Sequence, residues 1–229
     1  MRTTPDALML FAAGFGTRMG ALTQDRPKPL IEVAGRALLD HALDIATGAD
    51  VPRIVVNTHY MAEQIAAHLA GRSVAVSHET PDILDTGGGL RAALPLLGAS
   101  PVFTMNTDAV WRGPNPLKLL AEAWSEDVDA LLLCLPPAQA IGHIGKGDFV
   151  LDASGCATRG QGLVYTGAQI IRTEALKDMP EGAFSLNVVW DKLLKKGRLF
   201  GTTYPGKWCD VGHPGGITLA EDMLENSDV

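Results

Sequence analysis

The sequence has little that would indicate a disulfide framework, a membrane segment or a nucleic-acid partner. Cysteine occurs three times in 229 residues with no Cys-x-x-Cys pair, so free thiols in a reducing cytoplasm are expected. Basic residues number 19 against 26 acidic ones, for a net charge of -7, which argues against nucleic-acid polymers and anionic membranes as partners. No apolar run approaches the ~20 residues of a membrane span. Asp6 abuts the first apolar run, which favours a strand over a signal segment.

Motifs for nucleophilic catalysis are also absent. The sequence has no Gly-x-Ser-x-Gly elbow. Two of its six histidines fall in expected helices, and the other four, His59, His78, His143 and His213, lack partners at metal-ligand spacing. The composition, 46% hydrophobic and 20% charged, is that of a globular protein, and the length suits a single α/β domain. We therefore expect residues 1–229 to form one domain.

The stretch from Leu10 to Leu30, LFAAGFGTRMGALTQDRPKPL, predicts a triphosphate cradle. Apolar residues 7–11 indicate a short buried strand. In the following loop, residues 12–16, glycine lets several backbone N–H groups converge on one anion. Arg18 can fork phosphate oxygens, and Lys28 adds a point charge. The pattern is neither a dinucleotide fingerprint nor a P-loop, and the alternative is an ordinary turn with two surface cations.

Strands and helices alternate along the first half of the chain. Strands are expected at 7–11, 53–56, 73–77 and 101–105, and helices at 37–47, 60–69, 90–97 and 117–124. This order predicts a mostly parallel sheet covered on both faces. The later strands are expected at 130–135, 149–151, 164–171, 198–204 and 207–211, and the later helices at 185–196 and from Pro214. The glycine-rich residues 141–149 form either a lid over an acceptor or a plain hairpin insertion.

Two motifs resemble those of the sugar-1-phosphate nucleotidyltransferase family. One is Ala-Ala-Gly-x-Gly-Thr-Arg from Ala12 with Pro-Lys-Pro-Leu from Pro27, and the other is Trp-x-Asp-x-Gly from Trp208. The resemblance implies a Rossmann-like three-layer α/β/α fold with a mostly parallel, mixed sheet and a small acceptor-binding insertion. It also implies a Mg²⁺-dependent reaction in which a sugar 1-phosphate attacks the α-phosphate of an NTP and pyrophosphate leaves.

The resemblance assigns roles to individual residues. Arg18 and Lys28 are expected to be catalytic. Asp108, at the end of an expected strand, and Asp210 are expected to hold Mg²⁺, which suits two carboxylates with phosphate oxygens. Thr107 departs from the glycine that usually precedes this aspartate. The nucleotide-binding residues are expected to be Ala12, Ala13, Gly14, Gly16, Thr17, Glu79, Gly88 and Asn106.

The expectation for Gly88 depends on a second glycine cluster, residues 87–89. These glycines precede the expected helix at 90–97, where a loop would deliver free N–H groups. In the resembled family this loop and the acidic residue before it, here Glu79, face the base. The alternative is a helix-start loop that acts as a flexible hinge.

The resemblance is more specific for the branch of N-acetylmuramate-1-phosphate uridylyltransferases of bacterial cell-wall recycling. It rests on segments 79–90, 93–98, 147–149 and 182–184 and on the closing motif. This implies UTP as the donor and an acceptor site formed by Gly147, Asp148, Thr166 and Asn187. A hypothesis from position alone adds Lys146, as a cation for the lactyl carboxylate of muramic acid.

Other functions stay open at this point. The chain could be a mannose-1-phosphate guanylyltransferase or another sugar- or choline-phosphate nucleotidyltransferase, because the cradle and metal residues are shared. It could also be a nucleotide-sugar sensor or an inactive regulatory subunit. A binding module of that kind would not need both Arg18 and Lys28 together with Asp108 and Asp210. The sequence leaves the oligomeric state open.

Overall fold

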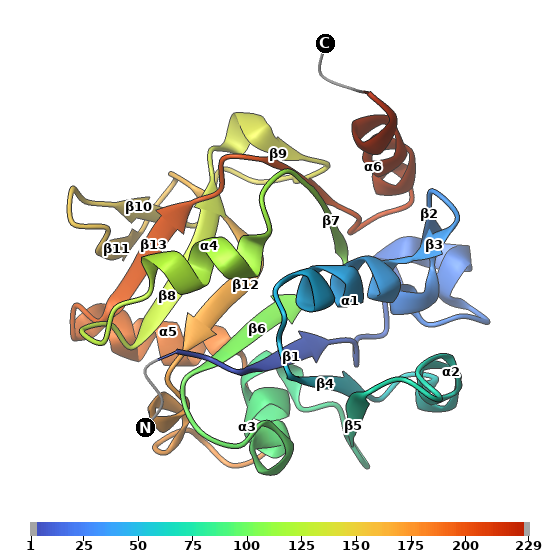
Figure 1. The fold of residues 1–229 in the computed structure, drawn as a ribbon, viewed down its shortest axis with the longest axis horizontal. Helices are drawn as coiled ribbons and strands as arrows, with labels where there is room; N and C mark the ends of the chain where they lie inside the picture. Colours follow the sequence, from blue (N-terminus) through green and yellow to red (C-terminus); the bar gives the residue numbers. More distant parts are fainter. Residues whose placement is uncertain (1–3, 227–229) are drawn as a thin grey trace.

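A seven-stranded sheet forms the centre of the computed structural model, which describes residues 4–226 (Figure 1). Its strands lie in the order β13 (Leu199–Thr203), β8 (Ala130–Leu135), β12 (Val164–Ile171), β6 (Val102–Asn106), β1 (Ala7–Phe11), β4 (Arg53–Thr58) and β5 (Val74–His78). β12 pairs antiparallel with β6 and β8, whereas the other neighbouring strands pair parallel. The mostly parallel, mixed sheet expected from the sequence is confirmed.

Helices cover both faces of this sheet, since successive residues of each strand point to opposite sides. One layer consists of α1 (Leu38–Gly48), α2 (Ala62–His68) and α4 (Pro116–Ala123), and the other of α3 (Asp85–Leu97) and α5 (Leu186–Lys195). In β1, Leu8 and Leu10 pack toward the first layer and Ala7 and Met9 toward the second. The three-layer α/β/α fold is confirmed. None of the helices in residues 4–226 has the length and apolar character needed to cross a membrane.

A second, three-stranded sheet brings the C-terminal part of the chain to the end of β6. It consists of β7 (Ala109–Arg112), β14 (Lys207–Asp210) and β9 (Ala140–Ile141), with α6 (Gly215–Glu225) packed on it. β14 pairs antiparallel with β7 so that Asp210 lies opposite Ala109. The N–H of Val211 donates to the carbonyl of Asp108 at 2.8 Å. This register places Asp210 beside Asp108 although the two are far apart in the sequence.

Two short hairpins complete the fold: β2 (Glu32–Val33) with β3 (Arg36–Ala37), and β10 (Phe149–Leu151) with β11 (Ala157–Arg159). The second begins at the last residue of the segment 141–149, for which the sequence allowed a lid or a hairpin. Phe149 is fully buried, and its ring lies edge-on to Trp190 of α5 with 5.8 Å between centroids. Phe149 therefore anchors the β10–β11 hairpin to α5.

Helix α3 begins earlier than the sequence predicts. It begins at Asp85 instead of residue 90, so the three glycines 87–89 lie in its first turns and not in a loop. A Cβ atom at Gly87 would lie 2.5 Å from Cδ2 of Phe184, and one at Gly89 would lie 2.5 Å from Oε1 of Glu79. Glycine is needed here because neighbouring groups pack directly on the helix backbone. The prediction of a loop at residues 87–89 is therefore wrong.

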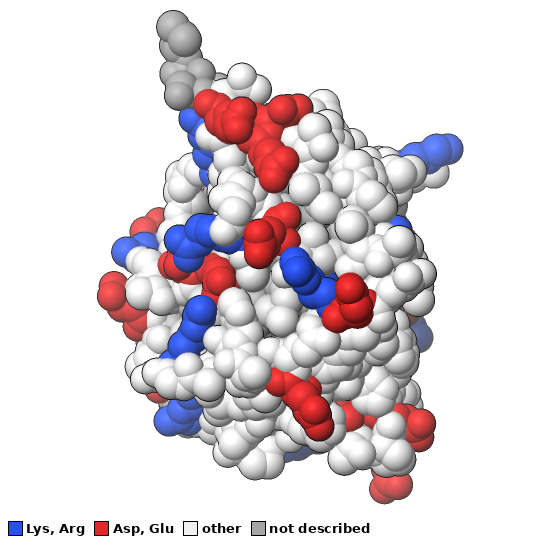
Figure 2. Space-filling view, turned by 90° about the vertical axis from the view of Figure 1, so that its right-hand side faces the viewer, with Lys and Arg blue, Asp and Glu red and all other residues white. Residues whose placement is uncertain are grey.

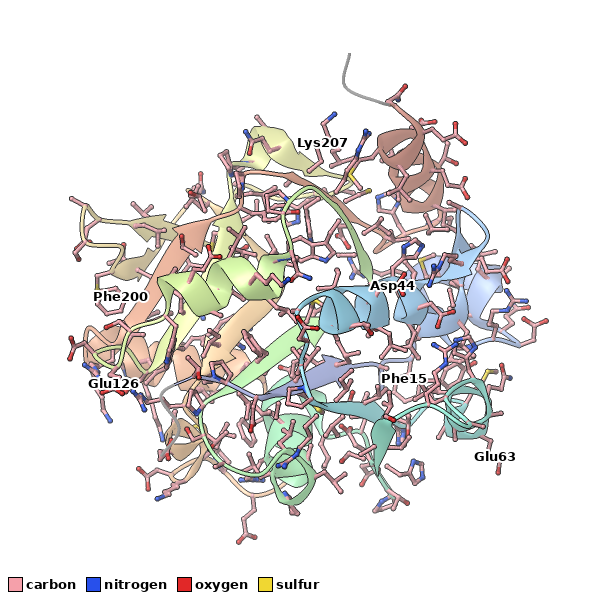
Figure 3. All side chains as sticks on the ribbon, viewed as in Figure 1. Phe15, Asp44, Glu63, Glu126, Phe200 and Lys207 are labelled. Carbon is pink, nitrogen blue, oxygen red and sulfur yellow. The ribbon has the colours of Figure 1, made fainter. Side chains whose placement is uncertain are left out.

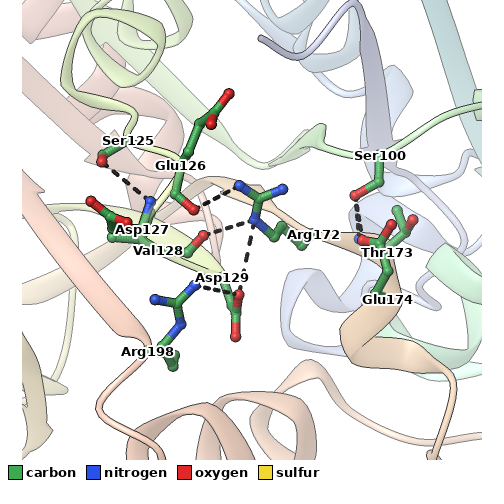
Figure 4. Close-up of polar contacts among 10 residues, drawn as sticks. All are labelled: Ser100, Ser125, Glu126, Asp127, Val128, Asp129, Arg172, Thr173, Glu174 and Arg198. Atoms are coloured by element: carbon green, nitrogen blue, oxygen red, sulfur yellow. Dashed lines mark hydrogen bonds and ion pairs between the residues drawn. The ribbon is translucent and has the colours of Figure 1, made fainter. Parts of the chain in front are cut away.

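Two arginines, Arg172 and Arg198, bind protein groups at the start of β8 and β13 (Figure 4). Arg172 donates from Nε to the carbonyl of Val128 at 3.0 Å and from Nη2 to that of Glu126 at 2.9 Å. Arg198 pairs with Asp129 at 3.1 Å. These two arginines are engaged by protein groups that join the strand ends, so they stabilise the fold at this edge.

Candidate active site

A cavity of about 310 Å³, here called the first cavity, opens at the carboxyl ends of β1, β4 and β6. Ligands bind at this edge in open α/β sheets. Most of the residues expected to bind nucleotide, to act in catalysis or to hold metal line this cavity. They are Ala12, Ala13, Gly14, Gly16, Thr17, Arg18, Lys28, Glu79, Asn106 and Asp108. The fold thus gathers residues from four separate segments around one space.

The loop after β1 presents bare backbone to the first cavity. Within residues 4–226, no protein group accepts a hydrogen bond from the N–H of Gly14, Phe15 or Gly16. A Cβ atom at Gly14 would have nothing within 4 Å, so no protein contact requires glycine there. Gly16 has a φ of 65°, and its Cβ would lie 2.9 Å from Cβ of Lys28. Successive free N–H groups of this kind form an anion-binding nest.

The residues just before α2 hold this loop in place. Tyr60 donates its N–H to the carbonyl of Ala13 at 3.5 Å and its hydroxyl to the carbonyl of Thr23 at 2.8 Å. The ring of Phe15 lies 5.5 Å from that of His59 and 5.6 Å from that of Tyr60, centroid to centroid. Figure 3 shows Phe15 beyond the end of β1, near α2. The loop is therefore fixed at both ends before any ligand binds.

A buried polar chain that the sequence reasoning missed supports the wall of the first cavity. Asn57, at the end of β4, accepts the N–H of Ala12 at 2.7 Å and donates to Oε1 of Glu79 at 2.7 Å. Oε2 of Glu79 accepts the N–H of Leu84 at 2.7 Å. The N–H of Ala12 is thus used inside the protein, and both oxygens of Glu79 are engaged. Asn57 itself lines the cavity.

Lys28 and two aspartates form a charged cluster beside the first cavity. Nζ of Lys28 lies 2.7 Å from Oδ2 of Asp108, and the Lys28 side chain is 11% exposed. Burial and then the charge of Asp108 raise the pKa of Asp210, while Lys28, Arg18 and His143 oppose the rise. A Cβ atom at Gly212 would lie 2.9 Å from Oδ1 of Asp210 and 3.0 Å from Nη1 of Arg18. Two carboxylates and two cations therefore meet where the second sheet joins the first.

The two carboxylates fit a small hard cation. Among the described residues, no group of three His, Cys, Asp or Glu side chains is placed to hold a metal. Mg²⁺ suits such a site, because it is held by one or two carboxylates and otherwise by water and phosphate oxygens. The hydroxyl of Thr107 donates to the carbonyl of Phe11 at 2.7 Å, so this side chain joins β6 to β1. Asp108 and Asp210 are the residues that could hold Mg²⁺.

A second cavity, of about 330 Å³, adjoins the first. The two share the lining residues Phe11, Asp85, Thr86 and Asn106. The rest of the second cavity is lined by Asp148, Phe149, Arg159, Tyr165, Ser185, Leu186, Asn187 and Trp190. Asp148 and Asn187, both expected at the acceptor, are therefore brought together between the β10–β11 hairpin and α5. Oδ2 of Asp148 accepts the N–H of Tyr165 at 2.9 Å.

Three residues that the sequence assigned to ligands are instead used inside the fold. The N–H of Gly88 donates to the carbonyl of Phe184 at 3.1 Å. Gly147 has a φ of 93° and packs on the backbone of Gly162. The hydroxyl of Thr166 donates to a β8 carbonyl at 2.7 Å. None of Gly88, Gly147 and Thr166 lines either cavity, so these three residues have packing roles in the structure, and ligand contacts at these positions stay a prediction.

The positions of Lys146 and Arg159 were not anticipated from the sequence. Lys146 is exposed and lines neither cavity, whereas Arg159, which no motif marked, lines the second one. Gly167, inside β12, has a φ of 88°, and its Cβ would lie 2.9 Å from the side chain of Asn106. A glycine inside a predicted strand is a recognisable signal of close approach, so its role could have been anticipated, whereas that of Arg159 could not.

Charged side chains of both signs are interspersed on the face that looks onto the ends of β1 and β4. Figure 2 shows Lys and Arg residues next to Asp and Glu residues there, with no broad basic area in that view. Positive charge at the site therefore comes from single side chains such as Lys28, which Asp108 holds in place. This pattern suits a small anionic ligand better than an extended polyanion.

The chain matches the MobA-like NTP transferase domain over residues 8–165 and belongs to that family. It is therefore a nucleotidyltransferase, as the resemblance implied. It is 40% identical to the N-acetylmuramate alpha-1-phosphate uridylyltransferase of Caulobacter vibrioides, over 98% of this chain and 99% of that protein. It is 32% identical to the protein of the same name from Neisseria meningitidis serogroup B, over 89% and 92% of the two chains. These relatives support nucleotidyl transfer to a sugar 1-phosphate.

Solved structures show the same fold at lower identity. HddC from Yersinia pseudotuberculosis, crystallised in complex with GMP-PN, gives a TM-score of 0.77 at 21% identity, covering 96% of this chain and 99% of HddC. A putative glucose-1-phosphate thymidylyltransferase from Bacillus anthracis, in complex with a sucrose, gives 0.77 at 16% identity, covering 97% and 96%. These likenesses establish the nucleotidyltransferase fold.

Proposed function

We propose that this enzyme transfers a uridylyl group from UTP to N-acetylmuramate 1-phosphate and releases pyrophosphate, with Mg²⁺ as cofactor. The observation that carries the proposal is the pair of adjoining cavities that share Phe11, Asp85, Thr86 and Asn106. One cavity has an anion nest beside two cations, and the other lies where an acceptor could approach the same point. Two relatives that align with this chain over most of their length are N-acetylmuramate alpha-1-phosphate uridylyltransferases, which supports UTP as the donor and this sugar phosphate as the acceptor.

The chain's own residues would align and neutralise the reacting phosphates. The free N–H groups of Gly14, Phe15 and Gly16 would bind phosphate oxygens of UTP. Arg18 and Lys28 would balance the charge on the α-phosphate and on the departing pyrophosphate. Asp108 holds Nζ of Lys28 at 2.7 Å, so this cation is in position before UTP binds. In phosphoryl chemistry of this kind, most of the catalysis comes from positioning and charge.

Asp108 and Asp210 would hold Mg²⁺ in this enzyme. Their carboxylates are adjacent, and burial and then Asp108 raise the pKa of Asp210, so its ionised form is disfavoured in the metal-free fold and a divalent cation would stabilise it. When bound, Mg²⁺ supplies positive charge to the phosphate oxygens. It would also relieve the repulsion between the two aspartates.

The acceptor needs no general base from the protein. The second pKa of a phosphate monoester is about 6, so the sugar 1-phosphate is mostly a dianion at neutral pH. Its phosphate oxygen attacks the α-phosphorus, and the bond from that phosphorus to the bridging oxygen breaks as pyrophosphate leaves. A histidine in the role of base is therefore not required, which fits the absence of one from both cavity walls in the described chain. We place this reaction in the cytoplasm, in the recycling of peptidoglycan sugars.

The first test is pyrophosphate release across a grid of four NTPs and several sugar 1-phosphates. The panel contains N-acetylmuramate, N-acetylglucosamine, glucose and mannose 1-phosphates, each with Mg²⁺ and with EDTA. Turnover confined to UTP, N-acetylmuramate 1-phosphate and Mg²⁺ is expected, and Asp108→Asn serves as the inactive control. Turnover with GTP and mannose 1-phosphate would keep the reaction and replace the substrates. That alternative has the support of 34% identity to a Drosophila melanogaster mannose-1-phosphate guanylyltransferase subunit, over 44% of this chain and 30% of the subunit.

A further inference from the structure

Arg159 is the one cation among the described residues that line the second cavity, where Asp85 and Asp148 contribute negative charge. The wall shared with the first cavity does not include Arg159. An acceptor with its phosphate at the shared wall would therefore present the far side of its sugar to Arg159. This guanidinium is separate from Arg18 and Lys28, which face the nucleotide phosphates.

The side chain of Arg159 is held by two aromatic rings and two polar side chains. Its guanidinium carbon lies 4.8 Å from the ring centroid of Phe149 and 5.7 Å from that of Trp190. Nη2 donates to Oδ1 of Asn187 at 2.7 Å and to Oδ1 of Asp191 at 2.9 Å, and Nε donates to the same Asp191 oxygen at 3.2 Å. Aromatic rings and two polar partners thus fix the plane of the guanidinium before a ligand binds.

Part of this guanidinium is left for a ligand. Among residues 4–226, no group accepts a hydrogen bond from Nη1 of Arg159. Asp191 engages the Nε and Nη2 side, and its own side chain is 58% exposed. Water therefore screens this ion pair, and the guanidinium retains attraction for a second anion. Two N–H donors on a fixed plane suit a carboxylate oxygen.

We propose that Arg159 selects acceptors whose sugar carries a carboxylate, by binding that carboxylate at the end of the second cavity remote from the phosphate. This inference rests on the proposed function, because N-acetylmuramate differs from N-acetylglucosamine by such a group, a lactyl ether. It replaces Lys146, which lines neither cavity, as the recognising cation. Asp148 adds to the orientation, since it repels a carboxylate from the part of the second cavity that is not shared with the first.

The test compares two acceptors of the same shape and different charge. One is N-acetylmuramate 1-phosphate, and the other is the same compound with its lactyl carboxylate converted to the primary amide. With saturating UTP, the natural enzyme should prefer the carboxylate by about 10- to 100-fold in kcat/KM, as expected for a charge-assisted contact. Arg159→Gln should reduce this preference to near unity, mainly through the KM for the acid, while the amide reacts within about threefold of the natural rate.

Two variants serve as controls. Lys146→Gln, which removes a cation outside both cavities, should keep the natural preference. Arg159→Lys keeps the charge without the planar fork and should retain part of the preference. Thermal unfolding of each variant checks that the fold is intact.

The outcomes separate this inference from the proposed function. An equal loss with both acceptors in Arg159→Gln would mean that Arg159 acts only in packing, and an unchanged preference would mean that another group reads the carboxylate. Either result overturns the inference while uridylyl transfer stands. If the natural enzyme turns over neither acceptor with UTP, the proposed function fails, and this inference fails with it.

Discussion

Replacing Asn57 by leucine should remove the hydrogen bonds that join the loop after β1 to Glu79 at the wall of the first cavity. Asn57 is 3% exposed and joins the N–H of Ala12 to Oε1 of Glu79, with both hydrogen bonds at 2.7 Å. Leucine has a similar size and offers neither group. The N–H of Ala12 then has no acceptor, and buried Glu79 keeps the N–H of Leu84 as a donor.

The expected loss of stability follows from these two contacts. A neutral hydrogen bond contributes about 1 kcal/mol and one to a carboxylate about 2 kcal/mol, for a total of about 3 kcal/mol. In a chain of this size each kcal/mol lowers Tm by roughly 2–4 °C, so Asn57→Leu should lower it by roughly 6–12 °C. Displacement of the loop after β1 should also raise the KM for UTP, by about tenfold.

Thermal and urea unfolding measure the stability, and steady-state kinetics measure the KM for UTP. The matched control is Asn115→Leu, because Asn115 caps α4 by accepting the N–H of Leu117 at 2.9 Å and donates to the carbonyl of Ile45 at 2.8 Å. Its partners are neutral, and it lines neither cavity. Asn115 also accepts the N–H of Lys118 at 3.3 Å, so this control should lower Tm by a comparable amount and leave the KM for UTP unchanged. Adding Glu79→Gln to Asn57→Leu should recover part of the stability, since it removes the buried charge.

The reasoning is refuted if Asn57→Leu leaves Tm at the natural value. It is also refuted if Asn57→Leu unfolds early while the KM for UTP stays at the natural value.

The other predictions concern charge and packing at the same site. Lys28→Met removes the cation held by Asp108 and should lower kcat by about 10²- to 10³-fold with less effect on the KM for UTP, as measured by steady-state kinetics. Gly87→Ala forces a Cβ against the ring of Phe184 and should cost about 1–3 kcal/mol in urea unfolding. Gly14→Ala has open space around its Cβ and should keep Tm while UTP binding weakens. Asp210→Asn should raise Tm at pH 7.5 in EDTA and not at pH 3, while turnover is lost. The pKa of Asp210 is raised in the folded state, so its ionised form destabilises the fold once the pH exceeds the usual pKa of an aspartate. The asparagine variant removes this cost at pH 7.5, and at pH 3 there is no such cost to remove.

Each of these predictions has an opposing result. An unchanged kcat in Lys28→Met would remove its role in the chemical step. Equal thermal stability of the Gly87→Ala and Gly14→Ala variants would contradict the packing argument. A lower Tm for Asp210→Asn at pH 7.5 in EDTA would mean that its carboxylate stabilises the metal-free fold.

The sequence was sufficient for the layers of the fold and for the loop after β1. Runs such as residues 130–135 are apolar at every position because β8 is buried on both faces, and this pattern is visible without a structure. The cradle residues lie close together in the chain, so their place around one cavity could be predicted from one stretch. Asp108 and Asp210 could be paired only through the resemblance, because the register of β14 on β7 joins them.

The sequence was insufficient where a residue's role depends on a distant packing partner. Glycines 87–89 look like a loop, yet they lie in a helix because residues 182–184 pack on it. Thr166 looks available, yet its hydroxyl is bonded to β8. Asn57 and Arg159 belong to no motif, and their roles appear only when β4 and the β10–β11 hairpin are placed beside their partners. Local patterns do not encode such contacts.

The most direct test of the central claim is to follow labelled phosphorus from UTP in a reaction with N-acetylmuramate 1-phosphate and Mg²⁺. UTP labelled at the α-phosphate should give a labelled nucleotide sugar, and UTP labelled at the γ-phosphate should give labelled pyrophosphate. That result would establish attack on the α-phosphorus with pyrophosphate as the leaving group. Transfer of the γ-label to the sugar, or no labelled nucleotide sugar from any NTP, would contradict the account.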